Sequence, residues 1–147
     1  MSNFLKNITV LVVFCVLTLT GFAHGQEKER KSCHLCGMYL DIYAATRHVV
    51  VYEDGTQMET CSLACAAKLY KGSDKKVTKI MAADYLTHEL IDAQTAFYLE
   101  GSDVPGVMSY TSRIAFKTKA DALEFQKKHG GTIIPFQEAL KNQIEKR

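Results

Sequence analysis

Four cysteines in two closely spaced pairs constrain this sequence more than any other feature. The first pair is Cys33-x-x-Cys36 and the second is Cys61-x-x-x-Cys65. Two such pairs supply the four thiolates of a tetrahedral metal site once the fold brings them together. If Cys61 and Cys65 both lie inside one helix, their Cβ atoms are about 5–6 Å apart, which is too far for an unstrained local disulfide. A disulfide between the pairs, such as Cys36 to Cys61, stays open as an alternative.

Residues 1–25 have the pattern of a secretory signal peptide. Lys6 is the only charge, a short apolar stretch runs from Ile8 to Leu19, and small residues follow at positions 21–25. The stretch falls short of the ~20 residues that span a bilayer, so we expect cleavage and a periplasmic or secreted mature protein. Cys15 follows Val13-Phe14 rather than small residues, so a lipid anchor is not expected. Disulfides are the default for cysteines in such a compartment.

Length and charge favour one small domain. The chain has 147 residues, of which 47% are hydrophobic and 23% are charged, and its formal net charge is +2. These values suit a single globular core and give no electrostatic support for binding to nucleic acid. We expect a flexible linker over residues 26–31 and one metal-binding domain over residues 32–147.

Short apolar and β-branched runs alternate with helical patterns along the chain. We predict strands over residues 48–52, 56–60, 77–81, 94–99, 113–117 and 132–134. Helices are predicted over 62–70, between Thr118 and Gly130, and from Pro135 onward. The order strand–strand–helix–strand comes early, and a shorter strand–helix–strand comes late. The expected fold is therefore α+β, with two small ββα-like halves in a single compact domain.

Further soft or nitrogen donors lie beside the first cysteine pair and on a later loop. A thioether next to thiolates favours Cu(I), whereas zinc rarely takes methionine, so Met38 points to copper. The imidazole of His34 suits either metal. Gly37 would let the backbone turn tightly enough for Cys36 and Met38 to face one point. Met108, in a later loop, is a second candidate thioether ligand, although core packing is the alternative for both methionines.

Two stretches of the sequence resemble a known protein family. The stretch His34-Leu-Cys-Gly-Met38 resembles the Cys-Gly-Met signature of NosL proteins, accessory factors of nitrous oxide reductase. Residues 106–140 are also similar, with a Met-Ser, an aromatic-ended strand, an Ala-rich helix and Gly-Gly before a strand. The resemblance implies a monomeric periplasmic α+β protein that carries one Cu(I) and has no catalytic residues. It puts copper on Cys36 and Met108, with Met38 and His34 as neighbours.

The chain departs from the family pattern in its extra thiols. Cys33 accompanies Cys36, and the Cys61/Cys65 pair resembles the heavy-metal-sensing TRASH motif, which has one early cysteine and a later C-x-x-x-C. Unlike many NosL proteins, the chain also lacks a convincing lipidation cysteine. The complete set of predicted metal ligands is Cys33, His34, Cys36, Met38, Cys61, Cys65 and Met108.

We expect an exported Cu(I) metallochaperone that serves the maturation of nitrous oxide reductase or a related copper protein. Its partners would be the copper ion and the acceptor enzyme or its maturation apparatus, which can include a membrane-associated complex. One alternative is a thiol-disulfide oxidoreductase using Cys33 and Cys36, although this pair follows a polar linker rather than a strand. The other is a structural zinc module that uses all four mature cysteines. No nucleophile–base order, phosphate loop or zinc-protease helix indicates an enzyme.

Overall fold

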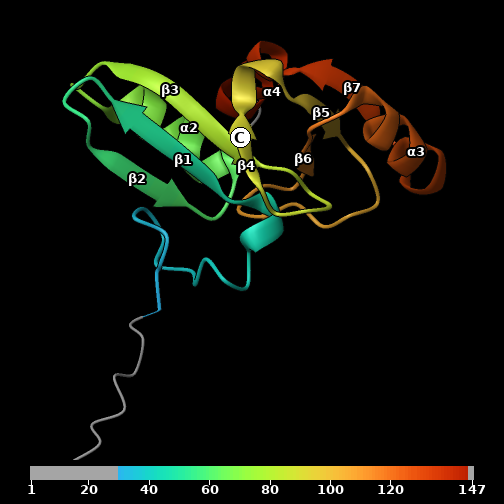
Figure 1. Ribbon diagram of the computed structural model, residues 1–147, viewed down its shortest axis with the longest axis horizontal. Helices are drawn as coiled ribbons and strands as arrows, with labels where there is room; N and C mark the ends of the chain where they lie inside the picture. Colours follow the sequence, from blue (N-terminus) through green and yellow to red (C-terminus); the bar gives the residue numbers. More distant parts are fainter. Residues whose placement is uncertain (1–29, 146–147) are drawn as a thin grey trace, which may run out of the picture.

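The computed structural model describes residues 30–145, so the predicted signal peptide and residues 26–29 of the predicted linker lie outside the described part. The predicted α+β class is confirmed: three helices and two small antiparallel sheets form the fold (Figure 1). In chain order the elements are η1 (Ala44–Thr46), β1 (His48–Tyr52), β2 (Gln57–Thr60), α2 (Leu63–Gly72), β3 (Val77–Ala83), β4 (Leu90–Asp92), η2 (Ala93–Thr95), β5 (Phe97–Glu100), β6 (Arg113–Phe116), α3 (Lys119–His129), β7 (Thr132–Pro135) and α4 (Phe136–Glu145).

The two halves of the fold share one topology. The first sheet has the order β2-β1-β3-β4, and the second has the order β6-β5-β7. In each half a strand pairs with the next strand, a helix follows, and a third strand returns to the free edge of the first. Every strand pairing is antiparallel. The two halves predicted from the element order are therefore both ββαβ units, and the second is as complete as the first.

Local sequence signals account for several element boundaries. Gly55 has φ +80°, the left-handed conformation that the predicted Asp54-Gly55 turn needs, and the amide of Tyr52 donates to the carbonyl of Thr56 at 2.9 Å. At the start of α3, the Thr118 hydroxyl accepts from the amide of Asp121 at 3.1 Å, which is the predicted N-cap. Gly130, at φ +69°, ends the same helix.

Three details of the predicted secondary structure are wrong. The strand predicted over residues 94–99 starts later than expected, because Ala93–Thr95 form the 3-10 helix η2 and β5 begins at Phe97. Strand β4 was not predicted, since three residues are too few to show a period. The last helix was predicted from Pro135 onward, but Pro135 is the final residue of β7 and α4 begins at Phe136.

One apolar core joins the two halves. It includes Leu63 of α2, Ile80 of β3, Tyr98 of β5 and Phe136 of α4, all of them buried. A parallel bridge between Asp84 and Ala115 also connects the end of the first sheet to β6. Figure 1 shows α2 against the sheet of β1 and β3, with α4 beside the second half. The shared core makes the described chain a single domain.

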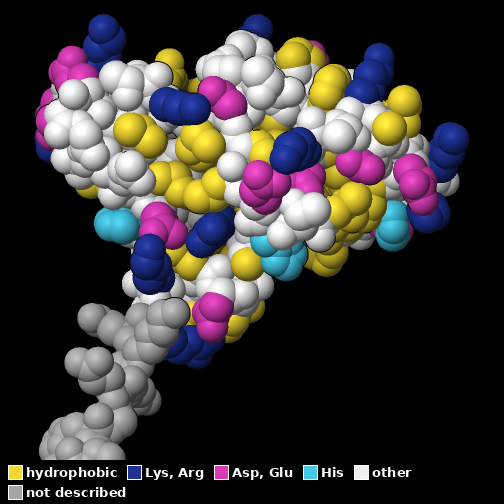
Figure 2. All heavy atoms as spheres, viewed as in Figure 1, with side chains coloured by type: hydrophobic (Ala, Val, Ile, Leu, Met, Phe, Trp, Pro, Cys, Tyr) yellow, Lys and Arg dark blue, Asp and Glu magenta, His cyan; other side chains and the backbone are white. Residues whose placement is uncertain are grey.

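The surface carries mixed charge. On the face in Figure 2, lysine and arginine side chains alternate with aspartate and glutamate side chains. Among the helices of residues 30–145, none combines the length and the apolar character that crossing a membrane requires.

His48 links the two halves inside the core. It is buried, its Nδ1 lies 2.9 Å from the Thr46 carbonyl, and its Nε2 lies 2.9 Å from the Tyr98 hydroxyl. The ring is therefore neutral, with Nδ1–H donating to Thr46 and Nε2 accepting from Tyr98. Burial lowers the pKa of His48 from 6.5 to about 4.

This lowered pKa predicts a loss of stability in mild acid. The unfolded chain takes up a proton below pH 6.5, whereas the folded chain does so only near pH 4, so stability is present above pH 6.5 and falls as the pH drops. Between pH 7 and 5 we expect the His48 contribution to the free energy of unfolding to fall by roughly 2 kcal/mol. Urea unfolding of the metal-free protein at several pH values measures the slope. The variant His48→Gln should show a shallower slope, and equal slopes would contradict the prediction.

Candidate metal centre

The first cysteine pair lies on a tight hairpin over residues 32–39. Ser32 and Tyr39 form its bridge, and the Cys33 amide donates to the Met38 carbonyl at 2.8 Å. The Gly37 amide donates back to the Cys33 carbonyl at 2.9 Å. Gly37 has φ +76°, a conformation that costs other L-residues about 1–2 kcal/mol. The tight turn predicted at Gly37 is therefore confirmed.

His34 fastens this hairpin to strand β2. The main-chain amide of His34 donates to the Glu59 carbonyl at 3.0 Å, and its Nδ1 accepts from the Glu59 amide at 3.1 Å. Through these main-chain and side-chain hydrogen bonds, His34 extends the edge of the sheet toward the cysteines. These contacts hold the hairpin in place and leave Nε2 as the ring nitrogen of His34 that has no partner among residues 30–145.

The second pair lies where β2 leads into α2. Ser62 is the N-cap of the helix, so Cys61 precedes the helix and Cys65 lies in its first turn. Cys61 and Cys65 therefore do not both lie inside the helix, so the spacing argument against a disulfide between them does not apply. The Thr46 hydroxyl donates to the Cys61 carbonyl at 2.8 Å and fixes the backbone there.

The fold brings all four cysteines together. Their Sγ atoms lie within 4.8 Å of one another, and all four residues are free thiols. The Sγ of Cys61 is 3.5 Å from that of Cys36 and 3.7 Å from that of Cys65. A metal ion with metal–sulfur distances of about 2.3 Å at the centre of a tetrahedron separates its sulfurs by about 3.8 Å. The four sulfurs, which we call the cysteine cluster, have the spacing that a metal ion requires.

Burial within the cluster is uneven. Cys33, Cys61 and Cys65 are buried, whereas Cys36 is partly exposed. Leu40 belongs to the same apolar cluster, and Met38, Tyr43 and Val107 pack against it. Three of the four thiols are therefore shielded from solvent, and Cys36 is the accessible one.

The thiols of the cluster share their protons unequally. Hydrogen bonding from Cys65 and then from Cys36 lowers the pKa of Cys61 to about 5, against the effect of burial. The same contact with Cys61, together with burial, raises the pKa of Cys65. Burial also raises the pKa of the Cys36 thiol. These contacts favour Cys61 as the first of the four thiols to lose its proton, and a thiolate is the form that binds a metal ion.

The other predicted donors lie around the cluster rather than within it. Met38 packs against the apolar cluster that contains the buried cysteines. His34 is exposed and is not one of the residues whose ligand atoms converge. Met108 follows Val107 in the chain, is 41% exposed, and lines a groove on the side of α2 and α4.

A thioredoxin-like use of Cys33 and Cys36 is not favoured by these surroundings. A nucleophilic cysteine needs both a lowered pKa and access to solvent. Cys36 has the access, but burial raises its pKa. Cys61 has the lowered pKa, but it is fully buried.

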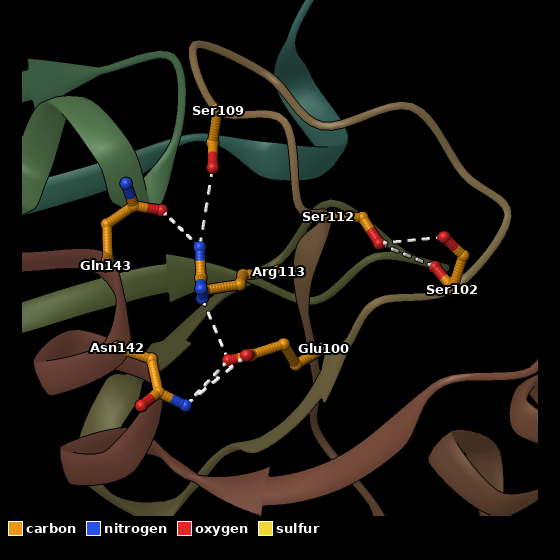
Figure 3. Close-up of polar contacts among 7 residues, drawn as sticks. All are labelled: Glu100, Ser102, Ser109, Ser112, Arg113, Asn142 and Gln143. Atoms are coloured by element: carbon orange, nitrogen blue, oxygen red, sulfur yellow. Dashed lines mark hydrogen bonds and ion pairs between the residues drawn. The ribbon is translucent and has the colours of Figure 1, made fainter. Parts of the chain in front are cut away.

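Sequence reasoning missed the polar residues that hold the loop between β5 and β6. Arg113, buried at the start of β6, donates to Glu100 at 2.9 Å, to Gln143 at 2.7 Å and to Ser109 at 3.4 Å. Figure 3 shows its guanidinium between the loop and α4, with Asn142 donating to the same Glu100 carboxylate. An arginine inside the otherwise apolar run Arg-Ile-Ala-Phe is the signal that marks this network.

The sequence matches a known protein family and two characterised relatives. The family model NosL matches residues 26–144. The copper-binding lipoprotein NosL of Stutzerimonas stutzeri is 24% identical to this chain, in an alignment that covers 88% of this chain and 78% of the relative. The HTH-type transcriptional repressor CutR of Bacillus subtilis is 24% identical over 115 residues, which cover 78% of this chain but only 60% of the repressor.

Two solved structures share the fold. The crystal structure of the copper chaperone NosL from Shewanella denitrificans matches with a TM-score of 0.60 and 22% identity, over 74% of this chain and 88% of that chain. The solution structure of the apo-NosL protein from Achromobacter cycloclastes matches with a TM-score of 0.51 and 17% identity, over 66% and 87% of the two chains. Since the family model also spans most of the sequence, this chain belongs to the NosL family.

Proposed function

We propose that this protein is an exported carrier that binds Cu(I) on the cysteine cluster and passes it to a copper-requiring acceptor. The observation that carries the proposal is the convergence of four Sγ atoms within 4.8 Å, three of them on buried residues. Soft thiolate ligands favour Cu(I) and zinc over harder metal ions, and a neighbouring thioether favours Cu(I). The thiolate held by Cys61 gives the cation its first ligand, and the other thiols lose their protons as the ion binds.

The open side of the cluster suits a carrier better than a permanent structural site. A closed structural site surrounds its metal completely, whereas an exchangeable site keeps one position accessible. Here Cys36 is the accessible ligand, and Met38 packs beside it. A thioether carries no charge and no proton, so Met38 can hold the ion while a partner displaces a thiolate. The acceptor's ligands would thus enter from the side of Cys36.

The relatives support copper as the cargo, since two of them are named as a copper-binding protein and a copper chaperone. From the family resemblance we propose nitrous oxide reductase, or a related copper protein with its maturation apparatus, as the recipient. We further propose a monomer that is exported after loss of residues 1–25. The S. stutzeri relative is named a lipoprotein, whereas we propose release without a lipid anchor. No catalytic role is assigned.

Structural zinc is the second candidate, because the Sγ distances of 3.5 and 3.7 Å suit a tetrahedral four-cysteine site. A structural zinc ion contributes directly to folding. Removal of the metal by a chelator would then unfold the protein. A copper carrier keeps its fold without metal, and its melting temperature would change little on chelation.

Metal analysis of the reduced protein tests the proposal. We expect near-stoichiometric copper after anaerobic loading with Cu(I), and X-ray absorption at the copper edge should show sulfur in the inner sphere. The same protein, treated with chelator, serves as the control for folding. An inner sphere of only oxygen and nitrogen would overturn the proposal, and a protein that retains zinc against Cu(I) would favour the second candidate.

A further inference from the structure

A large groove lies beside the cysteine cluster, between α2, α4 and the loop before β6. Its volume is about 1150 Å³. From α2 it takes Ala64, Ala67, Lys68 and Lys71, which follow the spacing of one helix face. The two alanines are buried and small, so they form a hollow floor between larger walls. The volume is above the usual range for small-molecule sites, about 300–1,000 Å³, and suits a segment of another protein.

The charge of the groove has one sign. Lys68 and Lys71 are exposed, and neither has a salt bridge or a side-chain hydrogen bond with any residue of the described range 30–145. No aspartate or glutamate lines the groove within that range. Within residues 30–145, five of the eleven lysines pair with a carboxylate, and Lys68 and Lys71 are the two unpaired lysines that line the groove. The wall formed by α2 therefore favours an acidic ligand.

The opposite wall is a strained loop with exposed side chains. Met108 has φ +56°, which is costly for a residue with a side chain and is found most often at functional sites. Met108 is 41% exposed, and Tyr110 is fully exposed. Methionine and tyrosine are enriched at protein interfaces. The loop thus presents contact residues of the kind that a partner protein covers.

The Arg113 network fixes this wall relative to α4. Arg113 donates to Ser109 on the loop and to Gln143 on α4, and both of these residues line the groove (Figure 3). Gly106 tightens the same loop, because a Cβ there would lie 2.1 Å from the Ser109 carbonyl oxygen. The groove is therefore shaped before a partner arrives, which lowers the entropic cost of binding.

We propose that this groove is the docking site for an extended acidic segment of a partner protein. The partner is the protein that exchanges copper with the cluster, and this identification rests on the proposed function. Val107 packs against the cluster and the next residue, Met108, lines the groove, so a partner held here lies next to the metal ligands. The unpaired lysines recognise its carboxylates, while Met108, Tyr110 and Ile144 contact its apolar side chains.

The test uses the copper-free mature protein and a short peptide in which aspartate and glutamate alternate with leucine. Amide NMR shifts are expected to change along Ala64–Gly72, at Met108–Thr111 and at Gln143 and Ile144. Lys68→Glu with Lys71→Glu should weaken peptide binding by at least roughly tenfold. The control reverses the charge of Lys119 and Lys127 on α3, which lie outside the groove, and should leave binding unchanged.

Several results would overturn the proposal. One is that a peptide with asparagine and glutamine in place of the acids binds as tightly as the acidic peptide. Another is that the α3 control loses as much binding as the Lys68/Lys71 variant. A third is that the NMR shifts change only at residues outside the groove. Shifts seen only with phosphatidylglycerol vesicles would assign the groove to a membrane surface, and shifts that depend on protein concentration alone would assign it to a second copy. Copper content is measured separately on each variant, so a failed copper site and a failed docking site are distinguished.

Discussion

Replacing Cys61 by serine should weaken Cu(I) binding by more than about 100-fold. Loss of a residue that only hydrogen-bonds to a metal ligand already lowers metal affinity by about 10–100-fold, and Cys61 is itself a proposed ligand. Cys61 is central to the cluster, with its Sγ 3.5 Å from that of Cys36 and 3.7 Å from that of Cys65. Its lowered pKa of about 5 also makes it the thiolate that meets the ion first. Anaerobic competition with a chromophoric Cu(I) chelator measures the affinity.

Cys36→Ser provides the matched comparison within the same cluster. It removes one sulfur, as Cys61→Ser does, but from the partly exposed side. We expect a smaller loss of affinity, because the three buried thiols of Cys33, Cys61 and Cys65 remain around the ion, together with Met38. Circular dichroism of both metal-free variants controls for folding. Copper binding by Cys61→Ser that equals the wild type would refute the role we give to the cluster.

Replacing Arg113 by methionine should lower the free energy of unfolding by about 3 kcal/mol or more, because breaking a buried ion pair leaves an uncompensated charge. The side chain of Arg113 is only 2% exposed and that of Glu100 is 14% exposed. Methionine fills a similar volume, so the loss reports on the charge and the hydrogen bonds rather than on a cavity. Urea unfolding at neutral pH gives the value.

The double variant Arg113→Met with Glu100→Gln isolates the ion pair. Removing both charges should restore part of the lost stability, since no buried carboxylate then faces an apolar side chain. Copper affinity should change little in the single variant, because Arg113 holds the groove and not the cysteines. A double variant that is less stable than Arg113→Met would show that the pair does not act as proposed.

Local chemistry made much of the fold predictable. The turn at Asp54-Gly55 and the cap at Thr118 depend on residues within a few positions of one another, so a single sequence reveals them. Both cysteine pairs were visible for the same reason. The convergence of the pairs was a prediction from metal chemistry, and the sheet edge at β2 brings them together.

Features set by distant residues were not predictable in the same way. The hydrogen bonds between His34 and Glu59 depend on which strand lies beside the hairpin, so the sequence alone did not show that His34 also fastens the hairpin to β2. The Arg113 network joins residues from β5, a loop and α4; the arginine beside an apolar run marks one member, but no local pattern identifies its partners. The break before β5 follows from the way Ala93 enters the shared core, and the periodicity of residues 94–99 does not record that contact.

Val107 and Met108 are consecutive residues that serve two different surfaces. A displacement of either one is transmitted through a single peptide unit to the other. If metal binding changes the affinity for a partner by some factor, partner binding must change the affinity for the metal by the same factor. Under the proposed function, this short stretch of backbone would couple binding of the copper cargo to binding of the recipient.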